Sequence, residues 1–226
     1  MSGGADPRAT LARDGVVRVR RPLARATVVG LVRAFPGAGS RRHLLAEPAV
    51  RRLIADPAVR ALVTRVLGRR AAAVRGLLID KREGADWALP FHQDRVVAVV
   101  ARRDTDGFSG WSLKDGVVHA LAPGAVLRRM IAVRVHLDAC DAGSGALRVL
   151  PGSHRHGVLD DDATRRLAST TAEHVLAAGV GDVVLMRPLL LHASARSGRV
   201  GPRRVVHIDF AAGELPGGLR WRACVC

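Results

Sequence analysis

Hydrophobic residues between positions 41 and 68 recur at spacings of three and four, in the stretch RRHLLAEPAVRRLIADPAVRALVTRVLG. This spacing is typical of amphipathic helices, and Pro48 and Pro57 stand where helices can begin. We expect two or three short helices in this region. The sequence DDATRRLAS predicts another helix over 161–169, and GVVRVRRPL predicts a short strand near the start of the chain.

After Gly68 the pattern changes to short apolar or alternating runs separated by Gly, Pro, Asp and Ser. These features are typical of strands joined by turns. The predicted strands are AAVRGLLID, RVVAVVAR, RMIAVRVHLDA, GALRVLP, DVVLMRPLLLHAS and RRVVHIDFA. Many short strands after a helical cap favour an antiparallel double-sheet barrel, a jelly roll, over alternating βαβ units. The predicted fold class is therefore mainly β with N-terminal helices.

A chain of 226 residues fits a single domain. We assign residues 1–70 to an N-terminal strand and helical cap, 71–215 to the β core with the catalytic site, and 216–226 to a C-terminal tail. We expect Cys224 and Cys226 to be disordered thiols of that tail. Three cysteines without a signal-peptide pattern favour the cytoplasm, and no apolar run approaches the ~18 residues of a membrane span. The oligomeric state stays open.

The formal net charge is +16, and Lys81 and Lys114 are the only lysines, so arginine supplies nearly all of the positive charge. A GC-rich coding bias is sufficient to explain so much arginine. The charge is at most a weak indication of an anionic substrate. A nucleic-acid-binding protein is disfavoured, because the arginines are scattered through every segment and the chain has 3% aromatic residues and no tyrosine.

One of three His-x-Asp tripeptides has partners that suit a metal site. His92 and Asp94 stand two apart at the mouth of a strand, so both side chains point to one face. His192 ends a later apolar strand, and Arg203 opens the strand after it. Two histidines and one carboxylate are the ligands of non-haem Fe(II) oxygenases, and an arginine fork suits a dicarboxylate cosubstrate.

The remaining histidines have ordinary structural interpretations. The pair His136 and Asp138 and the pair His207 and Asp209 are expected to be hydrogen-bonded structural pairs outside any metal site. The histidines of PGSHRHG, at positions 154 and 156, follow a Pro-Gly turn, and we expect loop residues there.

Four stretches, DKREGADWALPFHQD, GALRVLPGSHRHG, GDVVLMRPLLLHAS and GPRRVVHIDFA, resemble the phytanoyl-CoA dioxygenase family of Fe(II)- and 2-oxoglutarate-dependent oxygenases, from about Leu77 to Phe210. The resemblance implies a cupin-like double-stranded β-helix. It also implies that His92, Asp94 and His192 bind iron, that Arg203 pairs with the far carboxylate of 2-oxoglutarate, and that Ser194 assists Arg203.

The family's reaction would consume O2 and 2-oxoglutarate, release succinate and CO2, and oxidise a small molecule. Related halogenases carry a small residue in place of Asp94, so the carboxylate favours hydroxylation. Gln93 and Lys81 are further candidates for cosubstrate contacts, although support of the strand and a solvated lysine are the plainer interpretations.

Two aromatic residues are candidates for the substrate pocket. They are Trp111, which a packed indole would explain equally well, and Phe91, which stands where family members often carry tryptophan. Two other function classes stay open at this point. They are a non-catalytic cupin-type metal- or metabolite-binding barrel and a charge-driven nucleic-acid-binding protein.

Overall fold

Three antiparallel sheets build the protein in a computed structural model that describes residues 6–37, 39–81, 87–197 and 201–226. The largest sheet has six strands in the order β1 (Val16–Val19), β11 (Val183–Met186), β8 (Met130–His136), β13 (Arg203–Ala212), β3 (Ala71–Lys81), β2 (Arg41–Arg42). A four-stranded sheet has the order β10 (His174–Leu176), β9 (Leu147–Val149), β12 (His192–Ser194), β4 (Leu89–His92). A three-stranded sheet consists of β5 (Val96–Val99), β7 (Val117–Leu121) and β6 (Ser109–Lys114).

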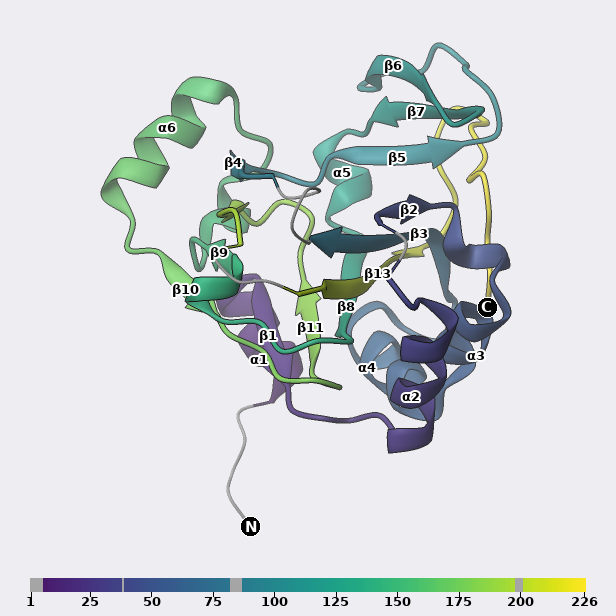
Figure 1. The fold of residues 1–226 in the computed structure, drawn as a ribbon. Helices are drawn as coiled ribbons and strands as arrows, with labels where there is room; N and C mark the ends of the chain where they lie inside the picture. Colours follow the sequence, from purple (N-terminus) through teal and green to yellow (C-terminus); the bar gives the residue numbers. More distant parts are fainter. Residues whose placement is uncertain (1–5, 38, 82–86, 198–200) are drawn as a thin grey trace.

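Helices α2, α3 and α4 lie together beside the six-stranded sheet, while α6 stands apart next to the four-stranded sheet (Figure 1). The α-helices are α1 (Pro7–Asp14), α2 (Arg25–Ala34), α3 (Pro48–Ala55), α4 (Pro57–Leu67), α5 (Gly124–Leu127) and α6 (Asp161–Thr170). Short 3-10 turns are η1 (Leu44–Ala46), η2 (Ala142–Ser144) and η3 (Ser153–His156).

Helix α4 shows why the predicted helices form where they do. The Asp56 carboxylate accepts a hydrogen bond from the Ala58 backbone N–H. Pro57 occupies the first helical position, where the backbone N–H that proline lacks would have no acceptor within the helix. The helix ends at Gly68, whose φ of 87° lies in the region that favours glycine.

Side chains of the six-stranded sheet alternate between a helix-covered face and a face turned into the barrel. On β8, Val133 and Val135 belong to the core that packs under the helices, whereas Arg134 between them lines an internal cavity. On β13, Val206 and Ile208 belong to the helix-covered core in the same way. This period of two is the ordinary geometry of a strand, and it turns every second residue of these strands into the barrel.

The barrel interior is apolar at one end and polar at the other. Where the large sheet faces the four-stranded sheet, a buried apolar cluster fills the space, including Leu147, Val149, Val184 and Met186. This two-sheet barrel is the predicted jelly roll, so the fold class is confirmed.

Most of the predicted elements are present within the described residues. Helices α3 and α4 occupy the predicted helical region, α6 covers the second predicted helix, and β1 lies inside GVVRVRRPL. The sequence did not indicate α1, α2, β6, β7 or β10.

The stretch DVVLMRPLLLHAS, predicted as one strand, was interpreted wrongly, because it forms β11 and β12 in two different sheets. Pro188 has no N–H for a sheet ladder, and a turn closes around it through the Leu190 N–H to the Arg187 carbonyl at 3.0 Å.

The predicted disordered C-terminal tail is also wrong. Val225 pairs with Ala73 of β3 through two backbone hydrogen bonds of 2.8 and 2.9 Å, and Leu219 is buried. Cys224 and Cys226 are exposed free thiols at the end of this packed segment. Within the described ranges, no helix is long and apolar enough to cross a membrane.

Candidate metal centre and cosubstrate pocket

Strand pairing brings two of the predicted metal ligands directly opposite each other. His92 on β4 is the register partner of His192 on β12, and opposed residues of an antiparallel pair project to the same face. Their ring centroids lie 4.3 Å apart. The bend of the chain after β4 is fixed by the Asp94 backbone N–H, which donates to the Pro188 carbonyl at 2.8 Å.

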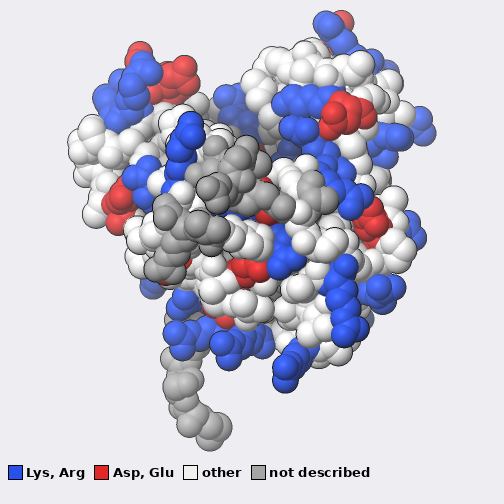
Figure 2. All heavy atoms as spheres, viewed as in Figure 1, with Lys and Arg blue, Asp and Glu red and all other residues white. Residues whose placement is uncertain are grey.

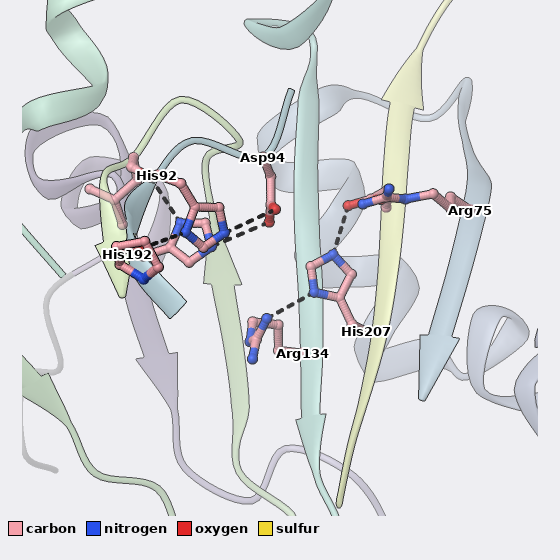
Figure 3. Close-up of polar contacts among 9 residues, drawn as sticks. Arg75, His92, Asp94, Arg134, His192 and His207 are labelled. Atoms are coloured by element: carbon pink, nitrogen blue, oxygen red, sulfur yellow. Dashed lines mark hydrogen bonds and ion pairs between the residues drawn. The ribbon is translucent and has the colours of Figure 1, made fainter. Parts of the chain in front are cut away.

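The Asp94 carboxylate faces both imidazoles (Figure 3). Its Oδ1 lies 3.9 Å from His92 Nε2, and its Oδ2 lies 3.6 Å from His192 Nε2. One donor atom from each of the three residues lies within 4.8 Å of the others, and this is the one such cluster in the part of the chain that the structure describes.

Both histidines are held in the tautomer that a metal requires. His92 Nδ1 lies 2.8 Å from the Pro90 carbonyl, and His192 Nδ1 lies 3.0 Å from the Leu190 carbonyl. A carbonyl oxygen can only accept, so each Nδ1 carries a proton and each Nε2, which faces Asp94, is the nitrogen available to bind a metal. Two imidazoles and one carboxylate fit Fe(II), because the set leaves coordination positions open.

Burial and neighbouring charge set the protonation states of this cluster. Burial opposes ionisation of Asp94, but nearby positive charge, including that of Arg75, outweighs burial and holds the Asp94 pKa well below its usual range. Burial lowers the pKa of His192 to about 4, against the opposing effect of Asp94. At neutral pH the carboxylate is therefore ionised and His192 is neutral, which are the states that bind a metal ion.

A cavity of about 310 Å³ adjoins the three ligands. Its polar lining combines the ligands with Ser194 and several basic residues, and its apolar lining comes largely from β3 and β4. Beyond the three ligands, the lining residues are Ser40, Arg41, Arg42, Arg75, Leu77, Leu78, Ile79, Lys81, Trp87, Leu89, Arg134, Leu147, Ser194, Arg203 and His207.

Arg203 lies in this cavity wall as the sequence predicted, and its neighbours are other predicted cosubstrate residues. It pairs in register with Lys81 of β3 and is only 3% exposed. Its Nη1 contacts Cys140 Sγ at 3.7 Å, and its buried Nε has no hydrogen-bond partner within the described ranges. A buried guanidinium without a carboxylate partner among the described residues fits the carboxylate of a bound dicarboxylate, because a buried cation is costly without an anion.

Lys81 and Ser194 are joined by a hydrogen bond of 2.9 Å between Nζ and Oγ. The Lys81 ammonium also donates to the carbonyls of Ala195, at 3.0 Å, and of Trp87. The lysine is 1% exposed, so it is not the solvated residue that the plainer interpretation predicted. Both side chains line the cavity beside Arg203.

Three of the predicted site residues lie away from the cavity lining. The Gln93 amide donates to the carbonyls of Gly157 and Leu189 at 2.8 Å, and its oxygen accepts from the Leu159 N–H at 2.9 Å. Trp111 packs in a second apolar cluster, with Arg102 over its ring at 5.7 Å.

Phe91 is the third of these residues, and the guanidinium carbon of Arg148 lies 5.5 Å from the centre of its ring. The contacts of Gln93 are those of a residue that supports the loop after β9.

Of the other two His-x-Asp pairs, His207 and Asp209 form the expected hydrogen bond, whereas His136 and Asp138 do not, and the buried His136 Nδ1 has no hydrogen-bond partner within the described residues. Asp138 is bound by both arms of Arg204, at 2.7 and 2.8 Å. His136 is buried away from the cavity, and burial lowers its pKa to about 3. His207 and Asp209 are hydrogen bonded to each other at 2.9 Å.

Sequence reasoning missed that three residues of this region, Arg75, Arg134 and His207, line the cavity. A signal was present in the strand period, because His207 stands four residues after Arg203 and therefore shares its face.

The family profile of phytanoyl-CoA dioxygenase matches residues 12–205. The chain belongs to this family. No curated protein matches it significantly. Its family membership confirms the predicted enzyme class, a non-haem Fe(II)- and 2-oxoglutarate-dependent oxygenase that uses O2 and a small-molecule substrate.

Solved structures resemble the enzyme in fold. The carbocyclase SnoK from nogalamycin biosynthesis has a TM-score of 0.72 at 13% identity, covering 94% of this chain and 85% of that one. EctD from S. alaskensis, solved with 2-oxoglutarate and 5-hydroxyectoine, has a TM-score of 0.71 at 21% identity, and the match covers 92% of this chain and 76% of that one. HygX from Streptomyces hygroscopicus, solved with nickel and 2-oxoglutarate, has a TM-score of 0.65 at 16% identity, and the match covers 92% of this chain and 87% of that one. At these identities the similarity shows the fold.

Proposed function

We propose that His92, Asp94 and His192 hold Fe(II), that Arg203 binds the far carboxylate of 2-oxoglutarate, and that the enzyme hydroxylates a C–H bond of a small molecule. The observation that carries the proposal is the placement of the unpartnered Arg203 Nε in the same cavity wall as the three clustered ligand atoms. A metal-binding barrel without catalytic activity would have no use for such a group.

Each residue has a defined task in this proposal. Asp94 supplies the one anionic ligand, and the backbone carbonyls of Pro90 and Leu190 keep both imidazoles turned with Nε2 toward it. Arg203 offers a planar two-point fork to a carboxylate, and the Ser194 hydroxyl, which accepts from Lys81, adds one donor beside that fork.

Iron with bound 2-oxoglutarate supplies the oxidising chemistry, in which 2-oxoglutarate and O2 yield succinate and CO2 and one oxygen atom goes to the substrate. The protein's part is to hold the ligands, admit the substrate and shape the pocket. We propose hydroxylation as the outcome because Asp94 keeps the third ligand position. Free thiols at Cys140, Cys224 and Cys226 support a reducing, cytoplasmic location.

Nucleic-acid binding has little support. On the face that Figure 2 shows, basic side chains are interspersed with neutral and acidic ones instead of forming one continuous patch. Several of the basic residues are used internally, such as Arg75 with Asp209 and Arg204 with Asp138.

The proposal is tested by removing the anionic ligand. Asp94→Ala should lower the iron bound per chain by about tenfold or more and reduce succinate release, screened against a metabolite panel, to background. The matched control is Asp104→Ala, since that side chain is 85% exposed and its nearest ionic partner is Arg102. Near-wild-type iron content and succinate release in Asp94→Ala would show that the metal site is elsewhere.

A further inference from the structure

A hydrogen-bonded chain of four polar side chains, three of them buried and Arg75 partly buried, runs beside the metal ligands (Figure 3). Arg134 on β8 is the register partner of His207 on β13, and its Nη1 lies 2.9 Å from His207 Nδ1. His207 Nε2 lies 2.9 Å from Asp209 Oδ1, and Arg75 Nε donates to Asp209 Oδ2 at 2.6 Å. Arg75, Arg134 and His207 line the cavity, so the chain forms part of its wall.

The direction of each hydrogen bond in this chain is fixed by chemistry. Arg134 can only donate, so His207 Nδ1 accepts. His207 then carries its proton on Nε2 and donates it to the Asp209 carboxylate. Arg75 neutralises Asp209 and, with the hydrogen bond that His207 donates, holds the pKa of Asp209 low against the effect of burial. His207 is therefore a neutral imidazole in one tautomer.

Arg134 is the one charged member of the chain whose side chain contacts no carboxylate within the described residues. It is 5% exposed, and the only hydrogen bond that its side chain makes there is the one to the neutral His207, while Asp94 and Asp209 act on its charge from a longer distance. Burial lowers its pKa to about 10, which still leaves the guanidinium charged at neutral pH. Burying a cation without an anionic partner is costly, and proteins keep such groups where a ligand completes them.

In the proposed function, the Asp94 carboxylate and both carboxylates of 2-oxoglutarate already have partners in the cavity. Asp94 belongs to the metal, one carboxylate of 2-oxoglutarate goes to the metal, and the other goes to Arg203. The remaining anion has to come from the substrate. The apolar lining around it, with Leu77, Ile79 and Leu147, suits a carbon skeleton without further charge.

We propose that Arg134 binds an anionic group of the substrate, which is an apolar carbon skeleton carrying one carboxylate, sulfonate or phosphate. His207, Asp209 and Arg75 are positioning residues that hold the guanidinium in the wall. The inference rests on the proposed function for its assignment of Arg203 to 2-oxoglutarate.

The test uses benzoate as an anionic probe and benzamide as its neutral match, titrated into metal-free protein and followed by the melting temperature. Arg203→Met serves as the background, because it removes the other cavity guanidinium that has no carboxylate partner within the described residues. In that background benzoate should bind at least about tenfold more tightly than benzamide, and adding Arg134→Met should abolish the difference. Equal binding of both probes in Arg203→Met, or an unchanged preference in the double variant, overturns the inference.

A second measurement separates the two arginines. In iron-loaded protein under argon, Arg134→Met should change the 2-oxoglutarate dissociation constant, read from the visible charge-transfer band, by less than about threefold. A loss of tenfold or so would place Arg134 in the cosubstrate site and overturn the inference. Absence of any 2-oxoglutarate band in the wild-type protein would overturn the proposed function instead, and the metal-free benzoate titration would still decide the role of Arg134.

The positioning chain has its own test. His207→Leu should weaken benzoate binding in the Arg203→Met background by about tenfold, because Arg134 loses the acceptor that orients it. His207→Gln supplies one acceptor and one donor and should restore binding to within about threefold. If both variants bind benzoate as tightly as the Arg203→Met background, His207 does not position Arg134.

Discussion

Arg203 and Arg204 are neighbours in the chain with opposite surroundings, because successive residues of β13 face opposite sides of the sheet. Arg203 lies in the cavity wall, with its Nε unpartnered within the described ranges. Arg204 points toward the helices, where it binds Asp138 with two arms and donates to the Phe35 carbonyl at 2.6 Å. The same residue type thus serves a ligand at one position and the fold at the next.

This contrast gives a prediction at the scale of single residues. Arg203→Lys should weaken 2-oxoglutarate binding by one to two orders of magnitude, about 1.4 to 2.8 kcal/mol, because lysine keeps the charge but loses the planar fork. Anaerobic titration of the iron-loaded variant, followed by the visible charge-transfer band, measures it. Arg204→Lys is the matched control and should leave this affinity unchanged. Equal weakening by both substitutions would mean that the fork is elsewhere.

At the scale of elements, helices α2, α3 and α4 support the face of the large sheet opposite the cavity. Their buried residues, such as Leu31, Leu53 and Val63, pack against the outward residues of β8 and β13. The Asp56 cap links two of these elements, since its carboxylate accepts from the first turn of α4 and from Thr27 Oγ1 of α2 at 3.2 Å.

Asp56→Ala should therefore lower the free energy of unfolding by about 1 kcal/mol, the usual effect of losing a helix cap. Urea denaturation of the metal-free protein measures the change. Asp161→Ala removes an exposed acidic residue from the first turn of α6 that is not its cap, and it should cost only a few tenths of that amount. An equal loss in both variants would argue that the cap contributes nothing beyond general charge.

At the scale of the whole molecule, buried neutral histidines make stability depend on pH. Burial is the main reason that the pKa of His136 falls from 6.5 to about 3, and the nearby Arg134 and Arg203 lower it further. Between these two values the unfolded chain binds a proton that the folded chain does not. The contribution to stability is therefore present above about pH 6.5 and is lost as the pH falls toward 3.

His136→Leu should remove this contribution to acid sensitivity. Between about pH 7 and about pH 5 the variant should lose roughly 2 kcal/mol less stability than the wild-type protein. Urea denaturation of both proteins in metal-free buffer across this range provides the comparison. Parallel pH profiles would show that His136 takes up its proton in the folded state.

Local chemistry determined much of this protein from the sequence alone. The Asp56–Pro57 start and the spacing of three and four fix α4, since capping and amphipathicity act within one helix. The period of two is enough to place Arg203 and Arg204 on opposite faces of their strand. The order of motifs, which resembles that of the family, then indicated His92, Asp94, His192 and Arg203 as site residues. In the structure the three ligands lie close together and Arg203 lines the same cavity.

Only the tertiary structure shows how each His-x-Asp pair is placed, because strand register is set by partners far away in sequence, and the sequence indicated the pairing of His92 with His192 through the order of motifs and not through any local pattern. His92 lies opposite His192, whereas His207 lies opposite Arg134. The sequence likewise could not show that DVVLMRPLLLHAS divides between two sheets or that Val225 pairs with Ala73. These outcomes depend on long-range packing and on how buried charges are balanced, and no local pattern encodes either of them.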